Sequence, residues 1–445
     1  MNKISLRKRI CSKAGGTVIL LASSPVLLAG PVVGPPPAPD TTPSWAEQES
    51  QDNEMSVFIP ASETERTKDQ PFVFGPLTIR PHIDYDVTYG TGIRSSTNSS
   101  QSSFIQTITP GVALDIGKHW TLDYTPSLVF YSNHAFSSTL NHLASLTGAT
   151  DYDDWVLGLT QTFTLDSSPQ SQTAAQTETT DFATAATGVY TINERMSADL
   201  AVNQDLNYVT GFIDSKTWST MDWLNYSFWK RLSVGVGVGG GYVILSQDPA
   251  AAPGNQTPGD QYYEDLQGRI NWRATDKLSF SVNAGFEHRN FDASPASANN
   301  PTGTAATSSL TPIFGASIQY QPFKYTQLSL SAGQTVGSSD YAIQSQSEID
   351  TTVSLSLNQR LLEKFYLDVS AGYNEIDYKE SINSGGIGIN TDRTDKNYSF
   401  NARLTRRVFK RGSVAVHYQY TSYQSTAPGF TYNSNQVGVE LNYSY

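Results

Sequence analysis

A strict alternation of apolar and polar side chains, which runs from residue 76 to the C-terminus, most constrains the fold of this 445-residue chain. Successive side chains of a β-strand point to opposite faces, so a period of two predicts strands with one apolar and one polar face. The first predicted strand places Leu77, Ile79, Ile83, Tyr85, Val87 and Tyr89 opposite Thr78, Arg80, His82, Asp84, Asp86 and Thr88. Segments 107–116 and 121–130 repeat the pattern. The chain is therefore predicted to be all-β.

The connections between the predicted strands alternate in length. Short polar turns are predicted at Gly117–His119, Asp151–Asp154, Asn193–Arg195, Trp229–Arg231, Thr275–Lys277, Lys324–Gln327, Glu363–Lys364 and Lys410–Gly412. Longer loops rich in Ser, Thr, Asn, Gly and Pro are predicted at 91–103, 166–180, 246–260, 290–309 and 379–395. Eight turns, with the first and last strands, give about 18 strands, or 16 if segments 138–150 and 181–192 are not strands. We therefore predict a transmembrane antiparallel up-and-down β-barrel with periplasmic turns.

Strand length and the polar face favour this barrel over a soluble sandwich or propeller. Each segment runs for about ten residues or more, which is the length that a tilted spanning strand needs. The polar face carries Thr, Ser, Gly, Asn, Asp and Arg, which suits a wet lumen. Aromatic girdles are predicted from Tyr89, Trp120, Tyr124, Trp155, Trp218, Trp229, Tyr242, Tyr262, Trp272, Tyr320 and Tyr418. The prolines Pro81, Pro110, Pro126 and Pro312 are expected at bulges or at the membrane edges, because proline has no N–H to donate.

The N-terminal 75 residues differ in kind from the rest. Residues 1–30 combine five basic residues, no acidic residue and an apolar segment, which predicts a signal peptide cleaved near Ala29. Residues 31–75 begin with Pro35-Pro36-Pro37 and continue polar and acidic, which predicts a disordered periplasmic linker. The single cysteine, Cys11, lies in the signal peptide, so disulfides and cysteine-ligated zinc are excluded after cleavage. The barrel is predicted over 76–445.

Two patterns resemble known families. The last strand alternates and ends in an aromatic residue, with Leu441, Tyr443 and Tyr445 on one face, and it resembles the C-terminal signal that the barrel-assembly machinery recognises. Gly117–Ser127 and Thr275–Val282 each place a short turn before an apolar-x-apolar strand, and with them region 76–445 resembles the outer-membrane β-barrel porin families of Gram-negative bacteria. That resemblance implies an outer-membrane location. Some members of such families resemble polysaccharide-export channels.

The alternation also identifies candidate residues that line the lumen. The selectivity candidates are Arg80, Asp84, Asp86, Asp115, Asp123, Arg269, Arg273, Arg289, Arg403 and Arg407. Acidic residues dominate the early strands and basic residues the later ones, so they could set a transverse field across the pore. Mutual salt bridging within a filled lumen is the equally weighted alternative. Segment 233–239 places only Ser and Gly inward, which predicts open space along that strand.

The sequence offers little chemistry beyond this. The net charge of −12 argues against a nucleic-acid partner. The six histidines show no metal-type spacing, and no G-x-S-x-G motif is present. We therefore predict no enzyme activity, no catalytic residues, no metal site and no cofactor. The predicted function is a pore for diffusion of small polar solutes, and the alternatives are a port for exopolysaccharide export or a surface structural or adhesive barrel. Expected partners are outer-membrane lipid, the assembly machinery and the solutes or polysaccharide, and the pattern is compatible with a homo-oligomer.

Overall fold

The computed structural model describes residues 72–96, 98–171, 173, 175–247, 259–293, 306–338, 345–362, 364–381 and 393–444. The predicted signal peptide, residues 31–71 of the predicted linker and Tyr445 lie outside the described residues. All described elements are strands: β1 (Val73–Phe74), β2 (Leu77–Ser96), β3 (Ser99–Ile116), β4 (Trp120–Tyr131), β5 (Thr139–Tyr152), β6 (Trp155–Asp166), β7 (Pro169–Gln170), β8 (Ala175–Gln176), β9 (Thr179–Asn193), β10 (Met196–Val209), β11 (Ile213–Trp229), β12 (Leu232–Gln247), β13 (Gln261–Thr275), β14 (Leu278–Phe291), β15 (Thr307–Phe323), β16 (Thr326–Ser338), β17 (Ser345–Leu361), β18 (Phe365–Ser381), β19 (Thr394–Arg407), β20 (Gly412–Ser425) and β21 (Tyr432–Ser444). Among them there is no helix with the length and hydrophobicity needed to cross a membrane.

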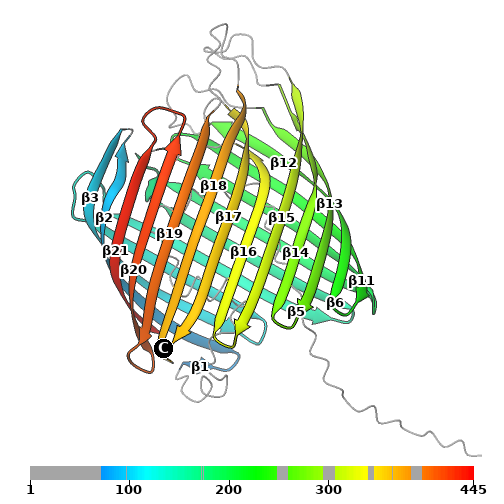
Figure 1. Cartoon of the computed structure of the whole chain (residues 1–445), viewed down its shortest axis with the longest axis horizontal. Coiled ribbons are helices and arrows are strands. Elements are labelled where there is room, and N and C mark those ends of the chain that lie inside the picture. The colour runs from blue at the N-terminus through cyan, green and yellow to red at the C-terminus, as the bar shows by residue number, and fades with distance from the viewer. Residues whose placement is uncertain are drawn as a thin grey trace, which may run out of the picture.

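Eighteen of these strands form one closed antiparallel barrel (Figure 1). Strands β2 to β6 and β9 to β21 follow one another around the wall, each paired with its neighbours in sequence. The ladder between β2 and β21, which pairs Val87 with Val439, closes the ring. This confirms the predicted fold and the count of 18. Strand β1 pairs with the first two residues of β2, so residues 73–74 of the predicted linker form a short strand.

The connections divide the barrel into two ends, which we call the turn end and the loop end. All eight predicted turns lie at the turn end, which is periplasmic in barrels of this type. The prediction of a long loop at 91–103 is wrong, because the β2–β3 ladder continues as far as Ser96 and Ser99. A bulge between Gly90 and Ile93 allows this extension. Gly92 lies in it with φ +75°, close against the Asn433 carbonyl, so a side chain at this position would clash.

The prolines lie where the ladders lack hydrogen bonds. Pro110 and Pro126 are in the stretch where β3–β4 pairs are missing, between Ile108–Leu128 and Val112–Tyr124. Pro81 lies one residue before the β2–β21 ladder begins at His82. The β15–β16 ladder ends at Phe314 on the loop side, and Pro312 lies two residues beyond that end. The barrel thus tolerates these residues because each missing N–H falls at a gap or an end.

The side chains on the two faces of the wall differ in polarity, as the alternation predicts. Large apolar side chains face outward and are exposed in the isolated chain, for example Leu266 at 59%, Val282 at 43% and Leu355 at 48%. Nine of the eleven predicted girdle aromatics are among these exposed side chains: Tyr89, Tyr124, Trp218, Trp229, Tyr242, Tyr262, Trp272, Tyr320 and Tyr418. Trp120 and Trp155 are half-buried. An apolar outer belt with aromatic residues at its rims fits a membrane-spanning barrel.

The wall separates between β15 and β16 at the loop end. Their ladder stops at the Phe314–Gln334 pair, although both strands continue beyond it. The next residues of β16, from Val336 to Ser338, are buried whichever way their side chains point. They remain paired with β17, whose Ser347 and Glu348 are also buried. These described ends of the two strands, residues 336–338 and 347–348, which we call the β16–β17 tip, therefore lie away from β15 on the inner side of the wall.

Candidate functional site: the lumen and its mouth

The lumen has an open polar wall on β16 and β17. Ser331 and Ser354 are paired across these strands, their hydroxyl oxygens lie 2.6 Å apart, and both side chains are exposed. Their neighbours Leu330 and Leu355 are also paired and point the other way, to the lipid face. Small hydroxyl side chains that are open to solvent provide a hydrated surface along this side of the barrel.

The inner face of β12 is closely packed. Its row of inward glycines was predicted to leave open space, and that prediction is wrong. A Cβ atom on Gly237 would meet the Trp223 ring at 2.6 Å, and one on Gly241 would meet the Tyr263 ring at 2.5 Å. Large side chains from β11 and β13 lie over the glycine strand from both sides. The glycines are therefore needed for packing and do not widen the channel.

One of these large side chains is Arg269 of β13, which crosses β12 over Gly235. Its guanidinium donates hydrogen bonds to Asn225 of β11, with Nε 2.8 Å from Oδ1, and forms an ion pair with Asp199 of β10. Its guanidinium carbon lies 4.4 Å from the centre of the Trp223 ring. A Cβ atom on Gly235 would lie 2.6 Å from Asn225 Oδ1 and 3.1 Å from Arg269 Cγ. This glycine therefore allows a network that spans four strands.

A second network surrounds Arg289 of β14, of which only 1% is exposed. Its guanidinium donates to Glu287 at 2.6 Å, to Gln261 at 2.9 Å and to the Val336 carbonyl at 3.0 Å. It also lies over the Tyr263 ring, 4.6 Å from its centre. Arg289 thus joins the β13–β14 wall to the inward tip of β16–β17.

A third group lies where the barrel closes. Arg403 of β19 forms an ion pair with Glu440 of β21 at 2.5 Å. The buried Asp84 of β2 accepts a hydrogen bond from the Asn442 amide of β21. Asp86 of β2 lies next to them and accepts from the Thr88 hydroxyl at 2.6 Å. The structure therefore brings predicted lumen residues from the first strand and the last strands into one cluster.

The other candidate charges lie nearer the turn end. Arg80 forms an ion pair with Asp115 at 2.8 Å, and the Thr121 hydroxyl also donates to Asp115, at 3.0 Å. Asp123 accepts from the Thr125 hydroxyl at 2.6 Å. Arg273 is half-buried near the end of β13. Arg407 is exposed at the end of β19, 5.9 Å from the centre of the Tyr366 ring.

The ion pairs bear on the two interpretations of these charges. Arg80, Arg269, Arg289 and Arg403 each bond an acid on their own strand or on a nearby strand of the same wall. Opposite charges at such distances cancel locally, so these pairs contribute little to a field across the pore. Mutual pairing along the wall describes these four arginines better than two opposed charged arcs.

An element that the sequence did not reveal narrows the mouth of the lumen. Residues 167–178, between β6 and β9, carry the two-stranded hairpin β7–β8. Ser168, Gln170, Ser171 and Thr177 of this segment are buried. The Ser171 hydroxyl is hydrogen-bonded to the Tyr432 hydroxyl of β21, and the hairpin also contacts β2. Since β3, β4 and β5 separate β6 from β2 in the wall, the hairpin crosses part of the lumen.

The hairpin is held at both of its ends. On its own side, the Gln176 amide bonds the backbone of Ser137 twice, at 2.8 and 2.9 Å, and Asn141 bonds Ser167 and Ser168 at 3.2 and 3.4 Å. On the far side, the Tyr432 ring stacks on Tyr423 at 5.5 Å. The Arg94 guanidinium lies 5.4 Å from the centre of the same Tyr432 ring. On the far side, the hairpin therefore contacts a cluster of aromatic and basic side chains formed by Tyr432, Tyr423 and Arg94.

The predicted assembly signal is only partly visible. Leu441 and Tyr443 of β21 face outward, 49% and 45% exposed, as the alternation predicts. Tyr445 lies outside the described residues. The sequence analysis did not single out His417 and Glu440, although the alternation places both side chains on the inner face of their strands.

Comparison with known proteins places this barrel in context. Residues 304–445 match the protein family described as "Putative beta-barrel porin 2". Among solved structures, the siderophore receptor PirA from Pseudomonas aeruginosa is 9% identical, with a TM-score of 0.43 over 82% of this chain and 80% of that one. OccAB3 from Acinetobacter baumannii is 10% identical, with a TM-score of 0.40 over 82% of this chain and 99% of that one. The outer membrane protein opdK from Pseudomonas aeruginosa is 10% identical, with a TM-score of 0.41 over 82% and 99%.

Among curated proteins, none matches the sequence. The family match covers the wall from β15 to β21, and it agrees with the closed 18-strand barrel and its apolar outer belt. The described residues thus form a closed β-barrel with an apolar outer belt, and its C-terminal third is similar to this porin family.

Proposed function

We propose that this barrel is a passive pore for small polar solutes. The observation that carries the proposal is the combination of a solvent-exposed hydroxyl wall on β16 and β17 with an inward hairpin at the mouth. The wall offers hydrogen-bonding groups that can replace part of a solute's hydration, and the hairpin limits the cross-section.

The inward elements favour small solutes over a polymer. The β7–β8 hairpin contacts the far wall through Ser171 and Tyr432, and the β16–β17 tip leans inward from the β15–β16 separation. A polysaccharide chain would have to displace both elements to pass. Export of exopolysaccharide and a surface structural or adhesive role are the functions that an absence of solute flux would favour. We also propose that the outward Leu441 and Tyr443 are read by the barrel-assembly machinery through strand addition.

Liposome swelling with neutral sugars of increasing size tests the solute-size limit. The wild-type barrel should pass monosaccharides and pass larger oligosaccharides much more slowly. A variant in which residues 169–176 are replaced by a short Gly-Ser linker should pass the larger sugars faster. Heat-modifiable gel migration controls for folding of both proteins. Equal size limits for the two folded barrels would show that the hairpin does not restrict the path.

A further inference from the structure

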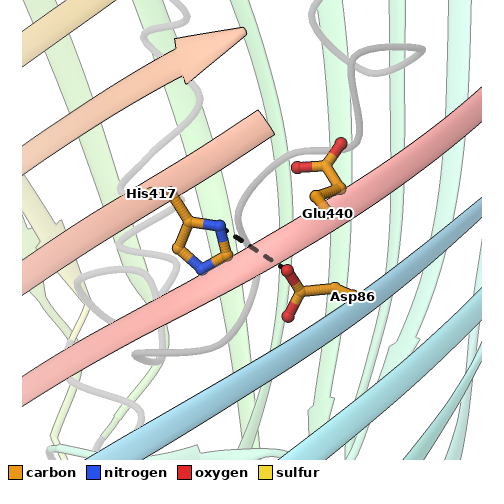
Figure 2. Close-up of side chains that lie close together, drawn as sticks. All are labelled: Asp86, His417 and Glu440. Atoms are coloured by element: carbon orange, nitrogen blue, oxygen red, sulfur yellow. Dashed lines mark ion pairs between the residues drawn. The ribbon is translucent and has the colours of Figure 1, made fainter. Parts of the chain in front are cut away.

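Three potential metal ligands converge on the inner face where the barrel closes. They are Asp86 of β2, His417 of β20 and Glu440 of β21, and one ligand atom from each lies within 4.8 Å of the other two (Figure 2). His417 and Glu440 are 6% and 5% exposed, and Asp86 is half-buried. Only the pairing of β2 with β21 brings these residues together, because Asp86 is more than 300 positions from the other two in the chain.

A chain of hydrogen bonds fixes which nitrogen of His417 carries a proton. The Thr88 hydroxyl donates its only hydrogen to Asp86 Oδ1, at 2.6 Å. The contact of 3.0 Å between Thr88 Oγ1 and His417 Nε2 must then be donated by the imidazole. In the neutral ring, Nε2 therefore bears the hydrogen and Nδ1 bears the free electron pair.

That electron pair faces another acceptor. His417 Nδ1 lies 3.5 Å from Asp86 Oδ2, as the dashed line in Figure 2 shows. Both atoms are buried and have no hydrogen-bond partner among the described residues. Two buried acceptors in this position repel each other unless a cation or a proton lies between them.

The charges around this gap call for a positive ion. Asp86 and Glu440 carry two negative charges in this cluster, and Arg403, paired with Glu440 at 2.5 Å, carries one positive charge. With a neutral His417, the negative charge of Asp86 remains next to the free electron pair of Nδ1. A bound cation would offset that charge and accept the electron pair.

The donor set also selects the kind of cation. One imidazole nitrogen with two carboxylates suits Zn²⁺ and similar divalent transition metals, since Mg²⁺ and Ca²⁺ prefer oxygen ligands alone. Ligand atoms of a tetrahedral Zn²⁺ lie about 3.3 to 3.4 Å apart, given the usual bond lengths. The separation of 3.5 Å between Nδ1 and Oδ2 is close to this value. The bond from Nε2 to Thr88 is the kind of support that metal-bound histidines commonly have.

We propose that His417, Asp86 and Glu440 bind one divalent transition-metal ion of the Zn²⁺ class on the lumen wall. The ion would tie β2 to β20 and β21, and so fasten the strands at which the barrel closes. The fourth coordination position of the ion would face the lumen, where water or a passing solute could occupy it. This inference does not depend on solute conduction.

Zinc binding by the folded, chelator-treated full-length barrel tests the proposal. Isothermal titration should show about one Zn²⁺ per chain, and Zn²⁺ should raise the temperature at which the barrel loses its compact gel migration. His417→Gln and Asp86→Asn should each weaken binding at least about tenfold, and Thr88→Val by about 10- to 100-fold. His142→Gln is the control, because this histidine bonds the outward Tyr124 on the lipid face and lies on β5.

Loss of Zn²⁺ binding in the site variants, with binding retained in His142→Gln, supports the metal site. If one site variant fails to fold, the folded ones among Asp86→Asn, Glu440→Gln and Thr88→Val decide the question. Absence of stoichiometric Zn²⁺ binding by wild-type protein would overturn the proposal, and a proton would then be what lies between His417 and Asp86. Unchanged binding in folded site variants would overturn it equally.

Discussion

The guanidinium of Arg289 in β14 donates a 3.0 Å hydrogen bond to the carbonyl of Val336 in β16 and so passes the intervening strand β15. This bond spans the region where β15 and β16 are no longer paired. It replaces part of the missing ladder and holds the β16–β17 tip inside the barrel. The same guanidinium neutralises the buried Glu287 at 2.6 Å.

Arg289→Met should therefore destabilise the barrel strongly. It leaves the Glu287 carboxylate buried without its ion-pair partner, which typically costs about 3–5 kcal/mol. The temperature of heat-modifiable gel migration should fall clearly below that of wild type. Adding Glu287→Gln to the variant should restore part of the loss, because the uncompensated charge is removed.

A matched control is available in the turns. Arg231 and Asp276 form an ion pair at 2.8 Å, and both side chains are exposed to solvent. Exposed pairs contribute roughly 0–1 kcal/mol, so Arg231→Met should leave the transition temperature nearly unchanged. Similar losses from Arg231→Met and Arg289→Met would contradict the role given to burial.

Gly235→Ala should disturb the Arg269 network. The added Cβ would lie 2.6 Å from Asn225 Oδ1, and overpacking of this kind typically costs about 1–3 kcal/mol. Gly268→Ala is the control, since its Cβ would meet only the Gly235 carbonyl at 3.9 Å. Chemical unfolding in detergent compares the two. A Gly235→Ala barrel as stable as Gly268→Ala would mean that the side chains over β12 have room to move aside.

The adjacent residues Ser354 and Leu355 test the faces of the wall with the same substitution. Leu355→Arg places a charge toward lipid, at a cost of about 2–4 kcal/mol near the midplane, so insertion should be impaired. Ser354→Arg places it in the exposed lumen wall and should assemble normally. Its reversal potential in a salt gradient should shift toward anions, because the new charge has no acid opposite it in the Ser331–Ser354 pair. Equal impairment of assembly by both changes would refute the assigned faces.

Much of the fold follows from local rules. Period-two patterning predicted the strand faces, and the turns predicted the count of 18 and the antiparallel order. The prolines Pro110 and Pro126 even marked a gap in the β3–β4 ladder. The extension of β2 and β3 beyond residue 91 was missed, because polar residues near a strand end resemble a loop and the bulge at Gly92 shifts the alternation.

The lumen was harder to predict, because its contacts join residues that are distant in sequence. The inward direction of the Asp86 side chain was predictable from the alternation. Its proximity to His417 was not, because it depends on closure of the ring by β2 and β21. The glycines of β12 suggested space, yet a neighbour such as Trp223 fills it, and alternation describes one strand at a time. The inward course of residues 167–178 has no periodic signal at all.

Single-channel recording of the purified wild-type barrel in planar bilayers tests the pore most directly. We predict discrete conductance steps with a linear current–voltage relation, and larger steps when residues 169–176 are replaced by a Gly-Ser linker. A folded, heat-modifiable barrel that shows no conductance steps in either form would contradict a diffusion pore.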